Sequence, residues 1–295
     1  MRQVFCTMMI AALAALAGVA RAEIANPADN QAGPELNREQ GQRTTSAYVE
    51  SIVVKGERSP YHEEELIGEY RQPRWTAFRR FPTTRVYVRP KGYVGVEQWY
   101  RVEDRRDGKT STTAQTEIEF GLPHRLQLDL YLISRKEGAS GETFVDNAVE
   151  VRYAFADWGE IWGNPTLYVE YVSQDSEANK VETKLLLGDE LVPGWHWGTN
   201  LVWEYTLGGA RTREYELAMG VSHTLSDDRF SLGLETKLAV EDEKGSRGDW
   251  DEDLRLGPSI QWRPLPQMHI DVAPLFGLTH DSKRADIFAV FGWEF

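Results

Sequence analysis

The sequence predicts an all-β fold: a transmembrane antiparallel β-barrel of about twelve strands, preceded by a polar N-terminal extension. Three observations predict it. From about residue 93 onward, apolar and polar side chains alternate in short segments that turn residues separate. Each segment has about the 9–11 residues that a tilted strand needs to cross a bilayer. The connections alternate in kind, mostly tight turns after even segments and longer polar loops after odd ones, which is typical of membrane barrels.

Residues 1–22 have the features of a secretory signal peptide. Arg2 precedes an apolar stretch, Val4 to Ala20, and the stretch ends in the small-residue pattern Ala20-Arg21-Ala22. We therefore expect cleavage after Ala22, with an uncleaved N-terminal anchor as the alternative. Cys6 is the single cysteine of the chain, so we expect the exported protein to use no disulfide or thiol chemistry.

Residues 23–91 are predicted to form a periplasmic extension. Up to residue 70 it is polar, and we expect most of it to lack fixed structure. Residues 71–91 differ, because seven basic residues occur there without an acidic one and alternate with aromatic residues. One interpretation is a plug that folds into the barrel through arginine–carboxylate pairs. The other is a basic tail attracted to anionic lipid or peptidoglycan. The candidate plug residues are Arg71, Arg74, Arg79, Arg80, Arg85 and Arg89.

Residues 92–295 contain the predicted barrel. Residues 126, 128, 130 and 132, all leucine, show the expected alternation, with polar residues between them. The same pattern predicts strands at about 93–103, 112–121, 125–135, 146–155, 165–173, 180–188, 196–206, 213–222, 229–240, 253–263, 267–279 and 286–295.

The last predicted strand ends on aromatic residues of one face, Phe291, Trp293 and Phe295. This ending resembles the assembly signal of bacterial outer-membrane β-barrels. The resemblance implies export to the Gram-negative outer membrane, where the chain meets lipid, lipopolysaccharide and the barrel assembly machinery.

Two further resemblances are specific to shorter stretches. Glu119-Phe120-Gly121-Leu122 before a tight turn, and Leu126-Gln127-Leu128-Asp129 after it, are similar to the uncharacterised barrels grouped with the phenol-degradation meta-pathway transporter family. That likeness implies a barrel with a transport role and brings no catalytic motif. Residues 50–56 resemble the short segment by which TonB-dependent transporters engage their energising partner, although the chain lacks room for the 22-stranded barrel of that family.

The polar face of each strand is predicted to line the lumen, because a charged side chain facing the lipid midplane costs about 2–4 kcal/mol. Acidic residues outnumber basic ones on this face. The predicted lumen-lining residues are Glu97, Arg101, Glu117, Glu119, Asp129, Glu150, Arg152, Glu170, Glu182, Lys184, Glu204, Glu216, Glu235, Lys237, Arg255 and Asp271.

The predicted function is passive movement of small solutes through this acid-biased lumen, by a channel that favours cations or polyhydroxylated solutes. The alternative is a structural barrel whose interior is closed by ion pairs, such as Glu150 with Arg152 or Glu235 with Lys184. A third possibility is an outer-membrane enzyme, but His196 and His269 are expected to point inward and to stand alone. We expect no catalytic residue, metal or cofactor. The net charge of −13 argues against nucleic acid as a partner.

Overall fold

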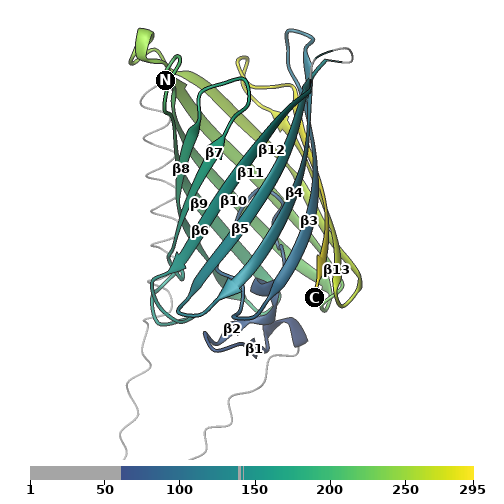
Figure 1. The fold of residues 1–295 in the computed structure, drawn as a ribbon. Coiled ribbons are helices and arrows are strands. Elements are labelled where there is room, and N and C mark those ends of the chain that lie inside the picture. Colours follow the sequence, from purple (N-terminus) through teal and green to yellow (C-terminus); the bar gives the residue numbers. More distant parts are fainter. Residues whose placement is uncertain (1–60, 139–140, 142) are drawn as a thin grey trace, which may run out of the picture. The chain divides into compact units, whose positions relative to one another are not determined.

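The computed structural model describes residues 61–138, 141 and 143–295 (Figure 1). Twelve antiparallel strands, β3 to β14, form a closed barrel in which each strand pairs with the next and β14 pairs with β3. The predicted fold class and all twelve predicted strands are confirmed. Within the described residues, no helix has the length and hydropathy to cross a bilayer. The barrel strands are β3 (Val94–Asp104), β4 (Thr110–Leu122), β5 (Leu126–Glu137), β6 (Thr143–Ala154), β7 (Thr166–Ser173), β8 (Lys180–Val192), β9 (Trp195–Thr206), β10 (Arg213–Ser226), β11 (Phe230–Asp242), β12 (Asp251–Leu265), β13 (Met268–Gly277) and β14 (Ala285–Glu294).

The barrel has an apolar outer surface because the alternation of each strand places its apolar side chains on the outside. In β6, residues alternate between exposed and buried along most of the strand. The exposed positions include Val149 and Val151, and the buried positions between and beside them include Glu150 and Arg152. Other large apolar side chains that are more than a third exposed include Leu130, Leu132, Leu232, Leu234, Ile260, Trp262 and Phe291. An outward-facing apolar band of this kind is the surface that a membrane barrel presents to lipid.

The two ends of the barrel differ in their connections. The turn end carries the tight turns, such as that between β4 and β5, and the C-terminus lies there (Figure 1). The loop end carries the longer loops, such as that between β11 and β12, which includes the short helix η3 (Lys244–Ser246). The connection between β6 and β7 is long for the turn end. Its Trp158 packs edge-on against Trp75, with ring centroids 5.6 Å apart, so the extra residues cover buried aromatic surface.

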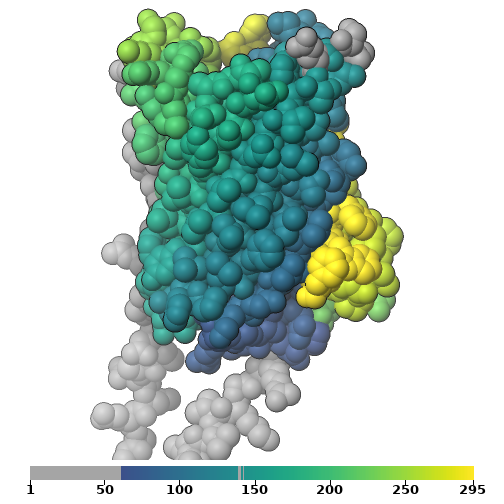
Figure 2. All heavy atoms as spheres, viewed as in Figure 1, coloured from purple at the N-terminus to yellow at the C-terminus, as the bar shows by residue number. Residues whose placement is uncertain are grey.

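Residues 61–92, called here the inner segment, close the turn end of the barrel. Their first part lies at the mouth, below the ends of the barrel strands, and their later part lies inside (Figure 1). The segment contains η1 (His62–Glu64), β1 (Leu66–Ile67), β2 (Gln72–Pro73) and η2 (Arg74–Ala77). Residues 61–70, which belong to the stretch expected to lack fixed structure for the most part, contain η1 and β1. Trp75, Phe81 and Val88 are at most 1% exposed. The space-filling view shows the closed outer surface of the barrel, with the first described residues at the turn end (Figure 2).

A row of glycines in the barrel wall makes room for the inner segment. Gly188, Gly198 and Gly220 lie directly opposite one another on β8, β9 and β10. A Cβ atom at Gly188 would lie 2.4 Å from Val86, and one at Gly220 would lie 2.6 Å from the Phe81 ring. Only residues without a side chain permit this approach, so the wall is shaped to receive these two side chains.

The apolar outer surface gives a direct test of the membrane-spanning fold. Leu234 lies near the middle of β11 and is 48% exposed on the outside. We expect Leu234→Arg to lower the free energy of unfolding in lipid vesicles by about 2–4 kcal/mol, because the guanidinium would face hydrocarbon. The free energy of unfolding is measured by urea titration, with tryptophan fluorescence as the signal. The matched control is Ser246→Arg in the exposed η3 loop, which should leave the unfolding free energy unchanged. Equal effects of the two substitutions would contradict a lipid-facing surface.

Candidate functional site

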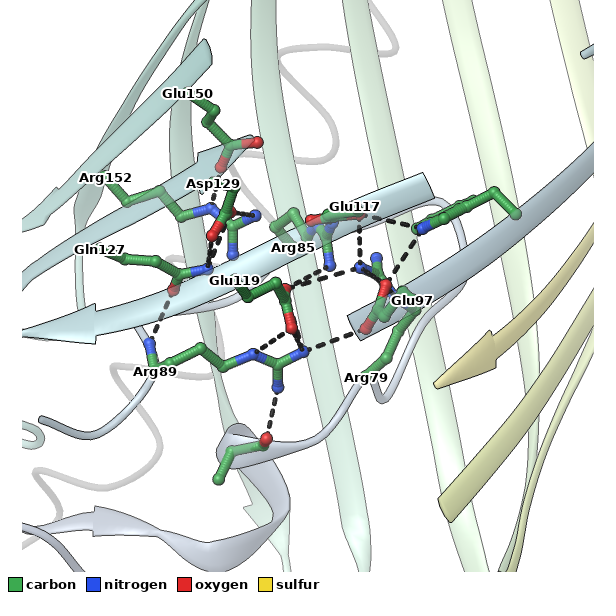
Figure 3. A network of polar contacts seen from close by, with 12 residues as sticks. Arg79, Arg85, Arg89, Glu97, Glu117, Glu119, Gln127, Asp129, Glu150 and Arg152 are labelled. Atoms are coloured by element: carbon green, nitrogen blue, oxygen red, sulfur yellow. Dashed lines mark hydrogen bonds and ion pairs between the residues drawn. The ribbon is translucent and has the colours of Figure 1, made fainter. Parts of the chain in front are cut away.

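Three arginines of the inner segment meet three glutamates of β3 and β4 inside the barrel (Figure 3). Alternation places Glu97, Glu117 and Glu119 on the inner face, and their carboxylates lie within 4.8 Å of one another. All three are at most 1% exposed. Three carboxylates so close repel one another strongly in a medium that excludes water, so cations are needed between them. Arg79, Arg85 and Arg89 supply those cations.

Arg89 is the most fully engaged of the three. Its guanidinium donates to Glu119 at 2.9 and 3.1 Å and to Glu97 at 3.2 Å. Its backbone N–H donates to the Gln127 side chain at 2.7 Å. Burial alone would lower the pKa of Arg89, but Glu119 and Glu97 raise it above its ordinary value, so the guanidinium stays charged. Pairs of this kind orient both partners as well as neutralising them.

The other two arginines complete the network. Arg79 pairs with Glu97, and its guanidinium lies over the Trp99 ring, 4.2 Å from the ring centroid. Arg85 donates to Glu117 at 2.6 Å. The Asn200 side chain on β9 accepts from the Arg85 backbone N–H at 2.8 Å and donates to its carbonyl at 2.6 Å. The inner segment is therefore fixed to opposite parts of the wall.

A second group of contacts holds the middle of the inner segment. Arg80 donates to Glu63 at 2.6 Å and to Thr224 of β10 at 3.1 Å. The backbone N–H and hydroxyl of Thr83 both donate to Glu235 of β11, at 2.8 and 2.5 Å. The segment thus contacts the barrel on several sides.

The barrel also has ion pairs of its own. Arg152 pairs with Glu150, the pair expected from the sequence, and with Asp129 at 3.0 Å. The expected pair between Glu235 and Lys184 is wrong. Lys184 lies on β8 and pairs with Glu182 at 2.7 Å, because β9 and β10 separate β8 from β11 in the sheet.

Beyond the inner segment, towards the loop end, the interior contains a cavity of about 740 Å³. Thr83 of the segment lies at its boundary, and the loops between strands contribute Arg106 and Asp281. Eleven acidic and nine basic side chains line it, so the acidic bias predicted for the lumen is small when all lining groups are counted. The distribution of these charges is more informative than their sum.

A continuous row of carboxylates crosses nine successive strands. Each member lies directly opposite the next in the strand register. Like charges in directly opposed positions destabilise a sheet. The row, called here the carboxylate row, is Glu119, Asp129, Glu150, Glu170, Glu182, Glu204, Glu214, Glu241 and Asp251. Because the strands tilt, the row climbs from the inner segment to the rim of the loop end.

Charge compensation differs along the carboxylate row, and in the described part of the chain Glu170, near its middle, also has no basic side-chain nitrogen within 4.0 Å. At the lower end, Glu119 pairs with Arg89. In the middle, Glu204 pairs with Lys180 at 3.1 Å. The three uppermost members have no basic side-chain nitrogen within 4.0 Å in the described part of the chain; they are Glu214, Glu241 and Asp251, and all three line the cavity. Carboxylates without a basic partner therefore lie at the loop end of the cavity.

The predicted lumen-lining residues fall into two groups. Seven line the cavity: Arg101, Glu182, Lys184, Glu204, Glu216, Lys237 and Arg255. Eight are at most 2% exposed, buried against the inner segment or one another instead of facing an open passage: Glu97, Glu117, Glu119, Asp129, Glu150, Arg152, Glu235 and Asp271. Glu170 lies between the groups and accepts a hydrogen bond from Tyr168 at 2.5 Å. The inner segment fills the space that the sequence alone leaves empty.

The structure also places the other predicted residues, those of the candidate plug and of the assembly signal. Arg71 is exposed, and Arg74 pairs with Glu65 at the outer part of the segment, so neither joins the buried network. Phe291 and Phe295 of the expected assembly signal are 42% and 79% exposed, and the backbone N–H of Phe295 donates to Val94 where the barrel closes. Residues 50–56 lie outside the described residues.

Of the two inward-facing histidines, His269 does not stand alone, contrary to expectation, whereas His196 makes no hydrogen bond. His269 is fully buried, with Nδ1 2.5 Å from Asp271 and Nε2 3.4 Å from Glu97. His196 is fully buried near Glu63. Asp271 contacts His269 from the same strand, two residues along, a spacing that places both side chains on the inner face. Glu97 of β3 and Glu63 of the inner segment are far from the histidines in sequence, and no spacing indicates those two approaches.

Comparison with known proteins supports the fold. The barrel is similar to an outer-membrane channel from Pseudomonas putida F1, with a TM-score of 0.52 and 10% identity, covering 71% of this chain and 98% of that one. It also matches the KdgM porin, with a TM-score of 0.49, 8% identity and coverage of 68% and 99%. No protein-family model and no curated protein matches the chain, so the resemblance to the phenol-degradation family stays a prediction. At such low identity the likeness shows the fold alone.

The buried network predicts how the inner segment responds to loss of one arginine. We expect Arg89→Met to weaken the association of the inner segment with the barrel by about 3–5 kcal/mol, because Glu119 and Glu97 lose a buried partner. Residues 61–92 should then become sensitive to trypsin while the barrel stays folded, as mass spectrometry of the fragments can show. The control is Lys91→Met, whose exposed pair with Glu69 contributes at most about 1 kcal/mol. Unchanged trypsin resistance in Arg89→Met would contradict this role of the network.

Proposed function

We propose that this protein is an outer-membrane channel for small cationic solutes, closed towards the periplasm by the inner segment acting as a plug. The observation that carries the proposal is the carboxylate row beside the cavity. It offers unpaired carboxylates at the loop end and leads, strand by strand, to the plug. Field focusing by such a surface raises the local concentration of cations.

The orientation follows from the connections. In outer-membrane barrels, short turns face the periplasm and longer loops face outward. The cavity then opens to the exterior, and the chain preceding the plug lies on the periplasmic side. We include in this proposal cleavage of the signal peptide after Ala22, contact of the outer surface with lipid and lipopolysaccharide, and insertion by the barrel assembly machinery through the final strand.

Conduction in this proposal requires the plug to move, because Phe81 and three arginines fill the turn end. A structural barrel without conduction is the second candidate, and the depth of the buried network favours it. His223 lies on the outer face of β10, directly opposite the exposed Trp195. It stacks on Trp195, with ring centroids 4.4 Å apart, and its Nδ1 lies 3.1 Å from the Gly194 carbonyl oxygen, an arrangement that gives no support for a catalytic role.

Single-channel recording in planar bilayers tests the proposal. We expect the refolded chain to conduct rarely, and a form lacking residues 61–91 to conduct steadily with cation selectivity. In that form, Glu214→Gln with Glu241→Gln should shift the reversal potential in a salt gradient towards zero, because two uncompensated carboxylates are removed from the mouth. Glu243→Gln, an exposed glutamate of the β11–β12 loop, is the control and should leave it unchanged.

Two results would overturn the proposal. Silence from both forms, with barrel structure confirmed by heat-modifiable migration, would favour the structural barrel. Anion selectivity in the form without the plug would contradict the role of the carboxylate row.

A further inference from the structure

A separate group of polar side chains joins the first turn of the inner segment to the barrel. It consists of Glu64 of η1, Glu190 of β8 and His196 of β9. One ligand atom from each lies within 4.8 Å of the others. Glu190 and His196 are directly opposite each other in the β8–β9 hairpin. The hairpin turn holds the third member in place, because the Gly194 backbone N–H donates to the Glu64 carboxylate at 2.7 Å.

His196 is the unusual member of this group. Its side chain is fully buried, and neither ring nitrogen has a hydrogen-bond partner. Trp75 packs on the imidazole, with ring centroids 4.5 Å apart. The nearest carboxylate oxygen recorded for Nε2 belongs to Glu63 at 3.7 Å, too far for a hydrogen bond. Leaving a buried polar group unsatisfied costs about 1–3 kcal/mol, so this imidazole lacks a partner that its surroundings are built to supply.

The two glutamates also lack a cation. Neither Glu64 nor Glu190 has a basic side-chain nitrogen within 4.0 Å among the described residues, and one carboxylate oxygen of Glu190 is buried without a partner. Arg80 is the basic residue of this region, and it pairs with Glu63 instead. Two carboxylates and one neutral imidazole form the donor set of a divalent ion.

We propose that Glu64, Glu190 and His196 bind a divalent transition-metal ion of the zinc type. An imidazole nitrogen with two carboxylate oxygens suits zinc, whereas calcium and magnesium take oxygen ligands only. Ligands about 2.1 Å from a tetrahedral ion lie about 3.4 Å apart, and rotation of the two half-buried glutamates provides the remaining approach. Water fills the fourth position.

With Nδ1 of His196 on the metal, Nε2 is the ring nitrogen nearest to Glu63, 3.7 Å from its carboxylate, so a small approach would complete that hydrogen bond. Metal-bound histidines usually donate their other N–H to a carboxylate, and Glu63 is the candidate here. Because Glu64 belongs to the inner segment and the other two ligands belong to the barrel, the ion crosslinks the two. This site rests on its own geometry and does not require the barrel to conduct.

Isothermal titration of the refolded chain with zinc chloride tests the site. We expect one ion per chain, and at least tenfold weaker binding in each of His196→Gln, Glu190→Gln and Glu64→Gln. Glu64→Gln lies in the inner segment, so it leaves the barrel wall intact. His280→Gln, in an exposed loop, and Glu69→Gln, at an exposed position of the inner segment, are matched controls that should bind zinc as the unchanged protein does.

A second measurement reports the crosslink. Zinc should slow trypsin cleavage within residues 61–92 of the unchanged protein and should not slow it in Glu64→Gln. Absence of zinc binding would overturn the proposal. So would binding that survives all three substitutions and is lost in Asp227→Asn, because that would place the ion at the neighbouring group of Glu63, Asp227 and Asp228. If the protein binds zinc but does not conduct, the zinc site is supported and the channel proposal fails. If it conducts but does not bind zinc, the channel proposal is supported and the zinc site fails.

Discussion

The pairing of Arg79, Arg85 and Arg89 with the glutamates of β3 and β4 is the constraint on which the rest of this structure depends. An eight-stranded barrel has an interior that its own side chains just fill, and twelve strands enclose more space. Charged side chains cannot face lipid, so they accumulate inside. Near the turn end they are packed away from water, where unpaired carboxylates are very costly. The chain supplies the missing cations from its own N-terminal part.

The inner segment is fitted to the wall by two different physical means. On one side, carboxylates and guanidinium groups fix its position by charge and hydrogen-bond direction. On the other, Gly188, Gly198 and Gly220 remove side chains where Phe81 and Val86 need the room. Electrostatic pairing and steric complementarity therefore operate on opposite sides of one segment. A basic tail attracted to a lipid surface requires neither feature, which is why the structure favours the interior position over that alternative.

The filled turn end and the hollow loop end give the interior two chemical characters. At the turn end, every charged side chain of the buried network has a partner of opposite charge. Above, the cavity exposes the last members of the carboxylate row to water without compensation. That polarity runs along the barrel axis, and it results from the tilt of the strands, which turns a line of directly opposed residues into a climbing path. The proposed zinc ligands lie at the other end, where the inner segment first contacts the barrel.

The sequence by itself determined the barrel, its strand number, the inward direction of its charges and the presence of an arginine-rich stretch with opposite charge. These properties are local: a period of two fixes which face each residue occupies, and turn residues fix where strands end. Only the tertiary structure decided which charges meet. Glu204 opposite Glu214, or Glu190 opposite His196, depends on register between strands, and Arg89 beside Glu119 depends on a segment folding back through a closed barrel. Alternation repeats identically at every register and carries no information about what fills the space inside, so these contacts follow from closure of the sheet.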